Sequence, residues 1–195
     1  MTKLKLTLTA VLLGLLLTGC AAKPQLSARS AGNPAGIDIS GRWVLRLEPD
    51  APVGANPAEE MMRLPPATPR RNGQEPVRAR RSVPSKGPDV GVFIEHGNLL
   101  QIKQTEYGVF VSFDRAVVEE FTFGENREVS LGPIEAQRVS GWEGREFVVE
   151  TMDRHGVTLV ETWGLASDGS QLVRDIDIVD GDKSLFATQQ VFDRS

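Results

Sequence analysis

Cysteine and histidine are scarce in this 195-residue chain, which has one cysteine and two histidines. A single cysteine excludes a disulfide framework and a cysteine-based zinc site, and two distant histidines leave few ways to hold a transition metal. Aromatic residues make up only 6% of the chain, whereas glycine and proline are frequent, with 19 and 12 residues. This composition favours turns over long helices, and the length suits one domain with appendages.

Motifs of catalysis are missing as well. The sequence has no Gly-x-Ser-x-Gly turn, no phosphate-binding glycine loop and no His-Glu-x-x-His pattern. His96 and His155 each precede a glycine in polar stretches typical of exposed turns. The densest acidic group could offer oxygen ligands to calcium, but its first members alternate with isoleucine as in a half-exposed strand; it consists of Asp175, Asp177, Asp180 and Asp182. We therefore predict no enzymatic activity, no bound metal and no cofactor.

The N-terminus has the layout of a signal peptide over residues 1–19. Lys3 and Lys5 precede an apolar run that is shorter than the ~20 residues needed to span a bilayer. The run leads to Leu17-Thr18-Gly19-Cys20, which resembles the lipobox of bacterial lipoproteins. That resemblance implies cleavage before Cys20, a palmitate-type lipid on Cys20, and, because alanine follows, sorting to the outer membrane facing the periplasm. The alternative is an ordinary secretory signal in which the cysteine is incidental.

Two segments lack the apolar content of a folded core. Residues 20–36 are rich in alanine, serine, glycine and proline, which predicts a flexible tether. Residues 49–88 contain nine prolines and are expected to be a largely disordered insertion. Residues 63–88 carry seven basic groups and one acid, a net charge of +6, whereas residues 89–195 carry 9 basic and 20 acidic groups, a net charge of −11.

The basic groups of the insertion include Arg70, Arg71, Arg78, Arg80 and Arg81. They form either a solvated linker or a contact surface for an anionic partner, such as an anionic lipid or an envelope protein. Nucleic acid is an implausible partner for a protein outside the inner membrane.

From residue 90 onward, short apolar stretches alternate with turn signals. The expected strands, after a first one over 37–47, are Val90–Glu95, Leu99–Thr105, Val109–Phe113, Ala116–Phe123, Arg127–Leu131, Glu135–Trp142, Glu146–Met152, Val157–Leu165, Gln171–Val179 and Ser184–Phe192. Their spacing predicts an all-β antiparallel meander. A sheet of this size curls, so we expect a barrel or a strongly curved, half-closed sheet spanning one domain over 37–195.

Period-2 alternation indicates which residues face the core. Trp43 shares a face with Leu45 and Leu47, and both Trp43 and Trp163 are expected to be buried. Glu161 and Arg174 fall among the apolar positions of their strands. Three interpretations remain open: a register error, a bulge, or a polar-lined pocket in which these two residues and the two tryptophans bind a ligand.

Gly41-Arg42-Trp43, followed by a many-stranded meander, resembles the Gly-x-Trp strand of lipocalins. The hairpin sequences over 142–151 and 163–169 resemble the closing hairpins of lipocalin-like domains in bacterial envelope proteins. The resemblance implies an arginine packed across Trp43, for which Arg174 is a possible counterpart. We expect a lipid-anchored binding or interaction module; the alternative is a lipocalin-type carrier of an apolar small molecule in the barrel interior.

Overall fold

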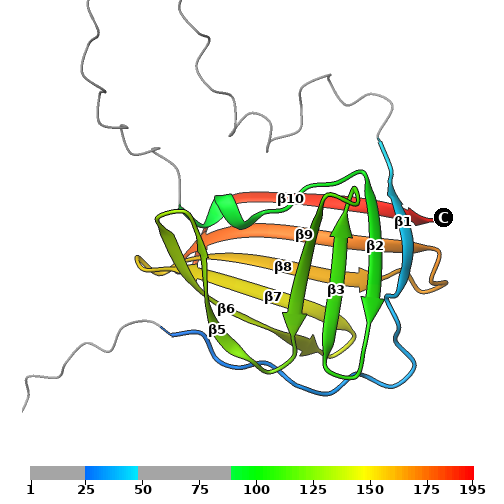
Figure 1. The fold of residues 1–195 in the computed structure, drawn as a ribbon, viewed down its shortest axis with the longest axis horizontal. Helices are drawn as coiled ribbons and strands as arrows, with labels where there is room; N and C mark the ends of the chain where they lie inside the picture. Colours follow the sequence, from blue (N-terminus) through cyan, green and yellow to red (C-terminus); the bar gives the residue numbers. More distant parts are fainter. Residues whose placement is uncertain (1–24, 48–88) are drawn as a thin grey trace, which may run out of the picture.

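The computed structural model describes residues 25–47 and 89–195 and shows an all-β protein. Ten antiparallel strands form one curved meander sheet in the order β4-β3-β2-β1-β10-β9-β8-β7-β6-β5 (Figure 1). Within the described residues β4 and β5 are the free edges, so the sheet is not closed. The prediction of an antiparallel meander in a strongly curved, half-closed sheet is confirmed. The strands are β1 (Gly41–Leu45), β2 (Leu99–Gln104), β3 (Gly108–Phe113), β4 (Val117–Thr122), β5 (Asn126–Leu131), β6 (Ile134–Glu143), β7 (Glu146–Asp153), β8 (Val157–Leu165), β9 (Gln171–Asp180) and β10 (Lys183–Arg194).

The sheet curves until its two edges approach each other at one end. β1 pairs with both β2 and β10, so the first and last strands are neighbours. β4 and β5 follow each other in sequence but do not pair, and the chain between them turns at Gly124, which has a left-handed φ of 69°. The Gly124 N–H donates to the Ser140 carbonyl at 2.9 Å, and the Ser140 hydroxyl donates to the Thr122 carbonyl at 2.8 Å. β4 is thereby held beside β6 at this end.

The predicted strand over Val90–Glu95 is wrong, because the chain forms a short 3₁₀ helix there, η1 (Asp89–Phe93). β1 already pairs with β2 and β10, so these residues cannot pair with the first strand. Val90, Phe93 and Ile94 are spaced i, i+3 and i+4, and one helical turn brings all three into the interior. The first strand is also shorter than expected: it ends at Leu45, and Leu47, expected in the core, is 75% exposed.

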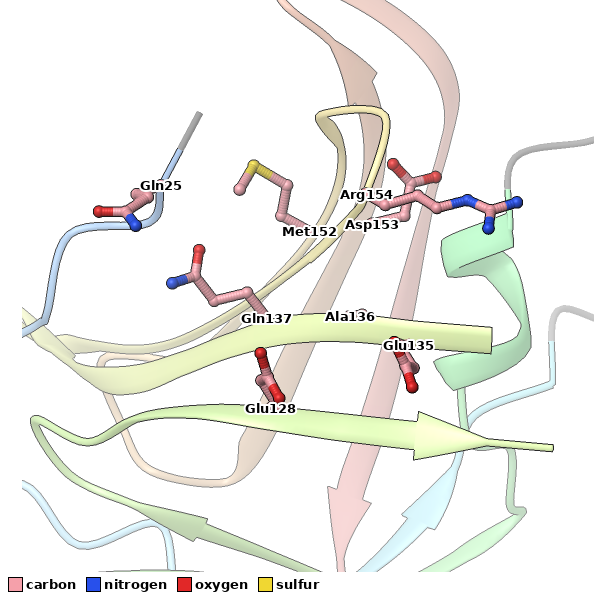
Figure 2. Close-up of a pocket in the computed structure, with 8 residues that line it drawn as sticks. All are labelled: Gln25, Glu128, Glu135, Ala136, Gln137, Met152, Asp153 and Arg154. Carbon is pink, nitrogen blue, oxygen red and sulfur yellow. The ribbon is translucent and has the colours of Figure 1, made fainter. Parts of the chain in front are cut away.

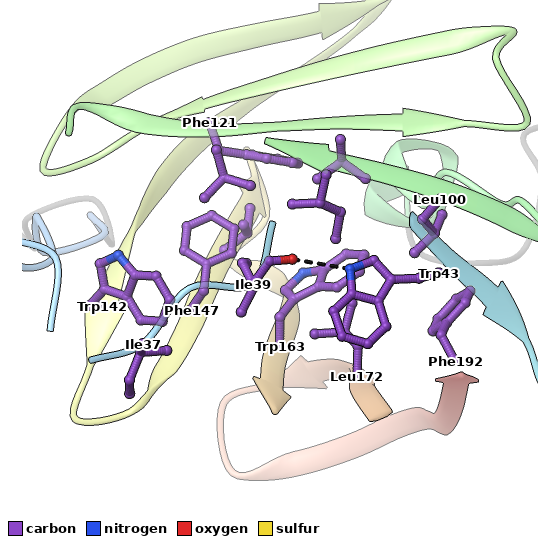
Figure 3. Close-up of a cluster of buried hydrophobic side chains, with 14 of the residues drawn as sticks. Ile37, Ile39, Trp43, Leu100, Phe121, Trp142, Phe147, Trp163, Leu172 and Phe192 are labelled. Carbon is purple, nitrogen blue, oxygen red and sulfur yellow. Dashed lines mark hydrogen bonds between the residues drawn. The ribbon is translucent and has the colours of Figure 1, made fainter. Parts of the chain in front are cut away.

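Aromatic side chains dominate the first of two core clusters, which we call the aromatic cluster (Figure 3). Trp43 and Trp163 are buried in it, as predicted, and the Trp43 indole N–H donates to the Ile39 carbonyl at 3.0 Å. Ile37 and Ile39, just before β1, pack into the cluster and close this end of the interior. Its members are Ile37, Ile39, Trp43, Leu100, Ile102, Val109, Val111, Phe113, Phe121, Phe123, Trp142, Phe147, Val149, Trp163, Leu172 and Phe192.

A smaller, largely aliphatic cluster fills the opposite end of the interior. η1 lies over β7 and β8, and its side chains close this end. Its members are Val90, Phe93, Ile94, Ala136, Leu159, Ile176 and Ile178. Among the described residues no helix has the length and apolar content needed to cross a bilayer.

Residues 25–36 belong to the stretch expected to be a flexible tether, yet the structure places them along the sheet. The Leu26 N–H donates to the Gln137 side chain at 2.9 Å, and Ser30 forms an isolated β-bridge with Trp142. On the same outer face of β6 and β7, Arg29 pairs with Glu143 and Glu150, and Val139 and Val148 are 0% and 3% exposed. A segment with little apolar content of its own is therefore ordered by the surface that it covers.

Candidate functional site

The four residues predicted to bind a ligand all lie in the interior of the sheet. Glu161 and Arg174 are 3% and 1% exposed, so the predicted register of β8 and β9 is correct and neither residue marks a bulge. The structure brings Glu161, Trp163 and Arg174 together: the Arg174 Cζ lies 4.6 Å from the centroid of the Trp163 ring. Trp43 belongs to the same aromatic cluster but has a different arginine neighbour.

That neighbour is Arg194, the last residue of β10, so the expectation that Arg174 packs across Trp43 is wrong. Arg194 lies opposite Trp43 in the strand pairing, and its Cζ is 4.2 Å from the centroid of the Trp43 ring. Its guanidinium also donates to the carbonyl groups of Gly169 at 3.0 Å and Ser40 at 3.2 Å. Arg174, the expected counterpart, lies over Trp163 instead.

The charge of Arg174 is satisfied within the protein. Its Nε donates to a Glu161 carboxylate oxygen at 3.0 Å, and its Nη2 contacts the same oxygen. Its Nη1 donates to the Glu95 carbonyl at 2.8 Å and to the Gln190 side chain at 3.1 Å. Charged hydrogen bonds of this kind offset the large cost of taking two ions out of water. The Arg174 guanidinium and the Glu161 carboxylate, which would bind a ligand in a polar-lined pocket, therefore bind groups of the protein instead.

A second buried arginine, Arg138 on β6, was missed by the sequence reasoning. Its Nε donates to the Thr151 hydroxyl at 2.9 Å, and its Nη1 pairs with a Glu119 carboxylate oxygen at 2.9 Å. The Cζ lies 5.5 Å from the ring of Phe93 and 5.6 Å from the ring of Phe121. Arg138 therefore joins β6, β4 and η1. Its position on the same face of β6 as Ala136 and Trp142 is the signal that could have identified it.

Glu95 and His96 follow η1 and lie close to the two buried arginines. Burial, followed by the charge of Glu119, raises the pKa of Glu95, although Arg174 and Arg138 act in the opposite direction. Burial, followed by the charge of Arg174, lowers the pKa of His96. The His96 Nδ1 and the Trp163 Nε1 have no hydrogen-bond partner among the described residues. The centre of the interior is thus a band of charged and polar groups between two apolar clusters.

Two hollows of the described surface lie outside the sheet. One groove of about 340 Å³ runs beside β5, β6 and β7, and is lined by Gln25, Glu128, Glu135, Ala136, Gln137, Met152, Asp153 and Arg154 (Figure 2). Another, of about 460 Å³, lies where residues 25–30 cross Trp142, Glu143 and Glu150. Both grooves are lined in part by residues 25–30, so this segment shapes both of them.

We call residues 25–31 the strap. Arg29 is its main anchor: the guanidinium contacts Glu143 at 2.5 Å and Glu150 at 2.9 Å. Burial acts to lower the pKa of Arg29, but the carboxylates of Glu150 and Glu143 outweigh it and the pKa is raised. The backbone is held as well, because the Asn126 side chain donates to the Leu26 carbonyl at 3.2 Å. Sequence reasoning missed the strap because it shows no alternation.

Several predicted site residues lie outside the described residues, namely Cys20, Arg70, Arg71, Arg78, Arg80 and Arg81, together with the signal peptide and the insertion over 49–88. In the part of the chain that is described, no group of three or more acidic, histidine or cysteine side chains could hold a metal ion. Asp175 and Asp177, considered for calcium, accept hydrogen bonds from Gln189 and Ser184 on β10.

Comparison of the chain with protein-family models, with curated proteins and with solved structures gives no match.

Proposed function

We propose that the protein is a lipid-anchored module of the cell envelope that binds a partner through its outer surface and catalyses no reaction. The observation that carries this proposal is the filled interior. The chain closes both ends with its own side chains, and the two buried arginines between them, Arg138 and Arg174, are paired with Glu119 and Glu161. An interior packed in this way supports a role for the outer surface.

The anchor is proposed from Leu17-Thr18-Gly19-Cys20. A lipid on Cys20 would hold the domain at a membrane, which by the resemblance to sorted lipoproteins is the outer membrane facing the periplasm. Partners of matching chemistry are an envelope protein or an anionic lipid, the latter attracted by the arginines of the insertion.

A carrier of an apolar small molecule is the alternative. It would require η1 or the Ile37–Ile39 segment to move out, because these residues occupy the ends through which a ligand would enter. The stack of Arg194 on Trp43 agrees with the lipocalin-like resemblance of the architecture. This contact concerns the architecture of the domain and does not distinguish an interaction module from a carrier.

Labelling cells with radioactive palmitate tests the anchor. The wild-type protein should incorporate label and partition into detergent, whereas Cys20→Ala should remain unlabelled and either unprocessed or soluble. An unlabelled, soluble wild-type protein would contradict the proposal.

Dye binding and native mass spectrometry of the purified protein separate the two functions. An interaction module should show neither enhanced fluorescence of a hydrophobic dye nor a co-purified small molecule. A stoichiometric apolar ligand would favour the carrier. Co-purification from detergent-extracted membranes would then identify a protein partner of the module.

A further inference from the structure

The strap fits its site so closely that one sheet position has no room for a side chain. A Cβ placed on Gly141, in β6, would lie 2.5 Å from the Ser30 carbonyl oxygen and 2.9 Å from the Arg29 Cβ. Real Cβ atoms do not approach backbone this closely, so any larger residue at Gly141 must displace the strap or the strand. The outer face of β6 is thus shaped to receive this segment.

When the strap is docked, a shorter length of chain separates the proposed lipid from the folded domain. Only four residues, 21–24, separate Cys20 from Gln25, and five residue steps reach at most about 17 Å. If the strap were free, the chain from Cys20 to Ile37 would have a typical span of about 23 Å and a maximum near 60 Å. The docked strap therefore fixes which part of the domain lies near the lipid.

We propose that the docked strap turns one end of the sheet, which carries η1 and the β5–β6 and β7–β8 turns, toward a lipid bilayer. This inference rests on the proposed lipid anchor at Cys20. Gln25 lines the same groove as Arg154 of the β7–β8 turn, whereas the β8–β9 turn lies at the opposite end of the sheet (Figure 1). The end near Gln25 faces the membrane, and the β8–β9 turn points away from it.

The chemistry of this end suits contact with lipid. Val92 of η1, Leu131 of β5 and Leu185 of β10 are 41%, 52% and 42% exposed. Val92 precedes Phe93, a member of the aliphatic cluster. Leu131 pairs with Ile134 across the β5–β6 turn, and Leu185 precedes Phe186; Ile134 and Phe186 both pack against that cluster. Covering exposed aliphatic side chains with a bilayer interface lowers the free energy of the system. They form an apolar rim around the end that the strap directs to the membrane.

Quenching of a fluorescent probe by the bilayer tests the orientation. The chain has one cysteine, which the lipid would occupy, so an introduced cysteine is the single thiol open to labelling. The lipidated full chain would carry the probe at Arg154→Cys or at Ser167→Cys, in vesicles of phosphatidylethanolamine and phosphatidylglycerol that contain a doxyl-labelled lipid. We expect strong quenching at Arg154→Cys and weak quenching at Ser167→Cys.

A matched pair of glycine substitutions tests the role of the strap. Gly141→Ala should displace the strap, whereas Gly164→Ala, on β8, has room, because the nearest atom to a new Cβ would be 3.8 Å away. Trypsin should cleave after Arg29 about tenfold faster in Gly141→Ala than in wild type. The same increase is expected in the double variant Glu143→Gln/Glu150→Gln, which removes the two carboxylates that pair with Arg29. The difference in quenching between the two probes should disappear in both strap variants and persist in Gly164→Ala.

The failures are distinguishable. Absence of palmitate on the wild-type chain would overturn the proposed anchor. Equal quenching of the two probes on a palmitate-labelled wild-type chain would overturn the orientation alone. The inference also falls if cleavage after Arg29 is as slow in both strap variants as in wild type, or if the quenching difference survives when that cleavage is fast.

Discussion

An arginine lies over a tryptophan at two places in this sheet, and the two places differ in how the arginine charge is satisfied. In the middle of the interior, Arg174 is 1% exposed, stacks on Trp163 and is paired with the carboxylate of Glu161. At the end of β10, Arg194 is exposed to water, stacks on Trp43 and donates to two backbone carbonyl groups. The same contact thus occurs with and without a buried counter-ion.

Solvent explains the difference. Water stabilises the charge of an exposed guanidinium, so Arg194 needs no carboxylate, and its stack adds a small favourable term. A guanidinium buried beside Trp163 loses that solvation and persists only with an anion and further acceptors around it. The middle of the interior is therefore more sensitive to substitution than its end.

Arg174→Ala should have the largest effect. The substitution leaves Glu161 buried without its partner and removes the packing on the Trp163 and Phe113 rings. We expect a loss of about 5 kcal/mol in the free energy of unfolding, the upper end of the range for breaking a buried ion pair. Urea denaturation measures it. The control is Arg174→Met/Glu161→Leu, which removes both charges and should recover much of the loss; a single variant as stable as wild type would contradict the importance of the pair.

Trp43→Ala and Trp163→Ala should each cost about 3–5 kcal/mol, because both side chains are almost completely buried. This is a large share of the ~5–15 kcal/mol that stabilises a typical domain. Iodide quenching of tryptophan fluorescence in the native state gives an independent check, since neither ring should be accessible. Ready quenching of both would contradict the strand register.

Alternation of apolar residues was enough to predict the strands from β2 onward. The limits of β8 coincide with the predicted ones, because Leu159 and Trp163 alternate cleanly with outward-facing residues. The interior position of Glu161 also followed from its place in that pattern. Its pairing with Arg174 could not be predicted, because the charge partner of a buried residue depends on which strand lies beside it.

The parts that sequence reasoning missed depend on contacts between distant segments. The strap has no pattern of its own and is held by the two carboxylates that pair with Arg29 and by the hydrogen bonds of Leu26. η1 was predicted as a strand because a short apolar run fits either structure when the neighbouring edges are unknown. The conformations of the strap and η1 depend on the strands that they pack against, and the pattern of residues within a short segment does not reveal those strands.

Arg194→Gln should have a much smaller effect than Arg174→Ala. The exposed stack on Trp43 and the hydrogen bonds to carbonyl groups together contribute about 1 kcal/mol to the free energy of unfolding. Arg194→Lys, which keeps the charge but loses the planar group, should be intermediate. Thermal unfolding compares the three proteins. A loss as large as that of Arg174→Ala would show that the end of the sheet is as sensitive as its middle.

Glu95→Gln should have the smallest effect, confined to a range of pH. Burial and the charges of Glu119 and Glu161 raise the pKa of Glu95 in the folded protein, against the opposing charges of Arg174 and Arg138. The folded state therefore holds this proton more tightly than the unfolded chain. The resulting stability is fully present below the unfolded-state pKa and is lost as the pH rises through the raised pKa.

Glu95→Gln should remove that loss while its backbone carbonyl continues to accept from Arg174. Urea midpoints of wild type and variant between about pH 4 and pH 8 measure the difference, which should increase with pH and then become constant. Glu106→Gln, at an exposed position between β2 and β3, is the matched control and should follow wild type. A difference between wild type and Glu95→Gln that does not vary with pH would show that Glu95 acts through packing, because only the titration of Glu95 makes this difference depend on pH.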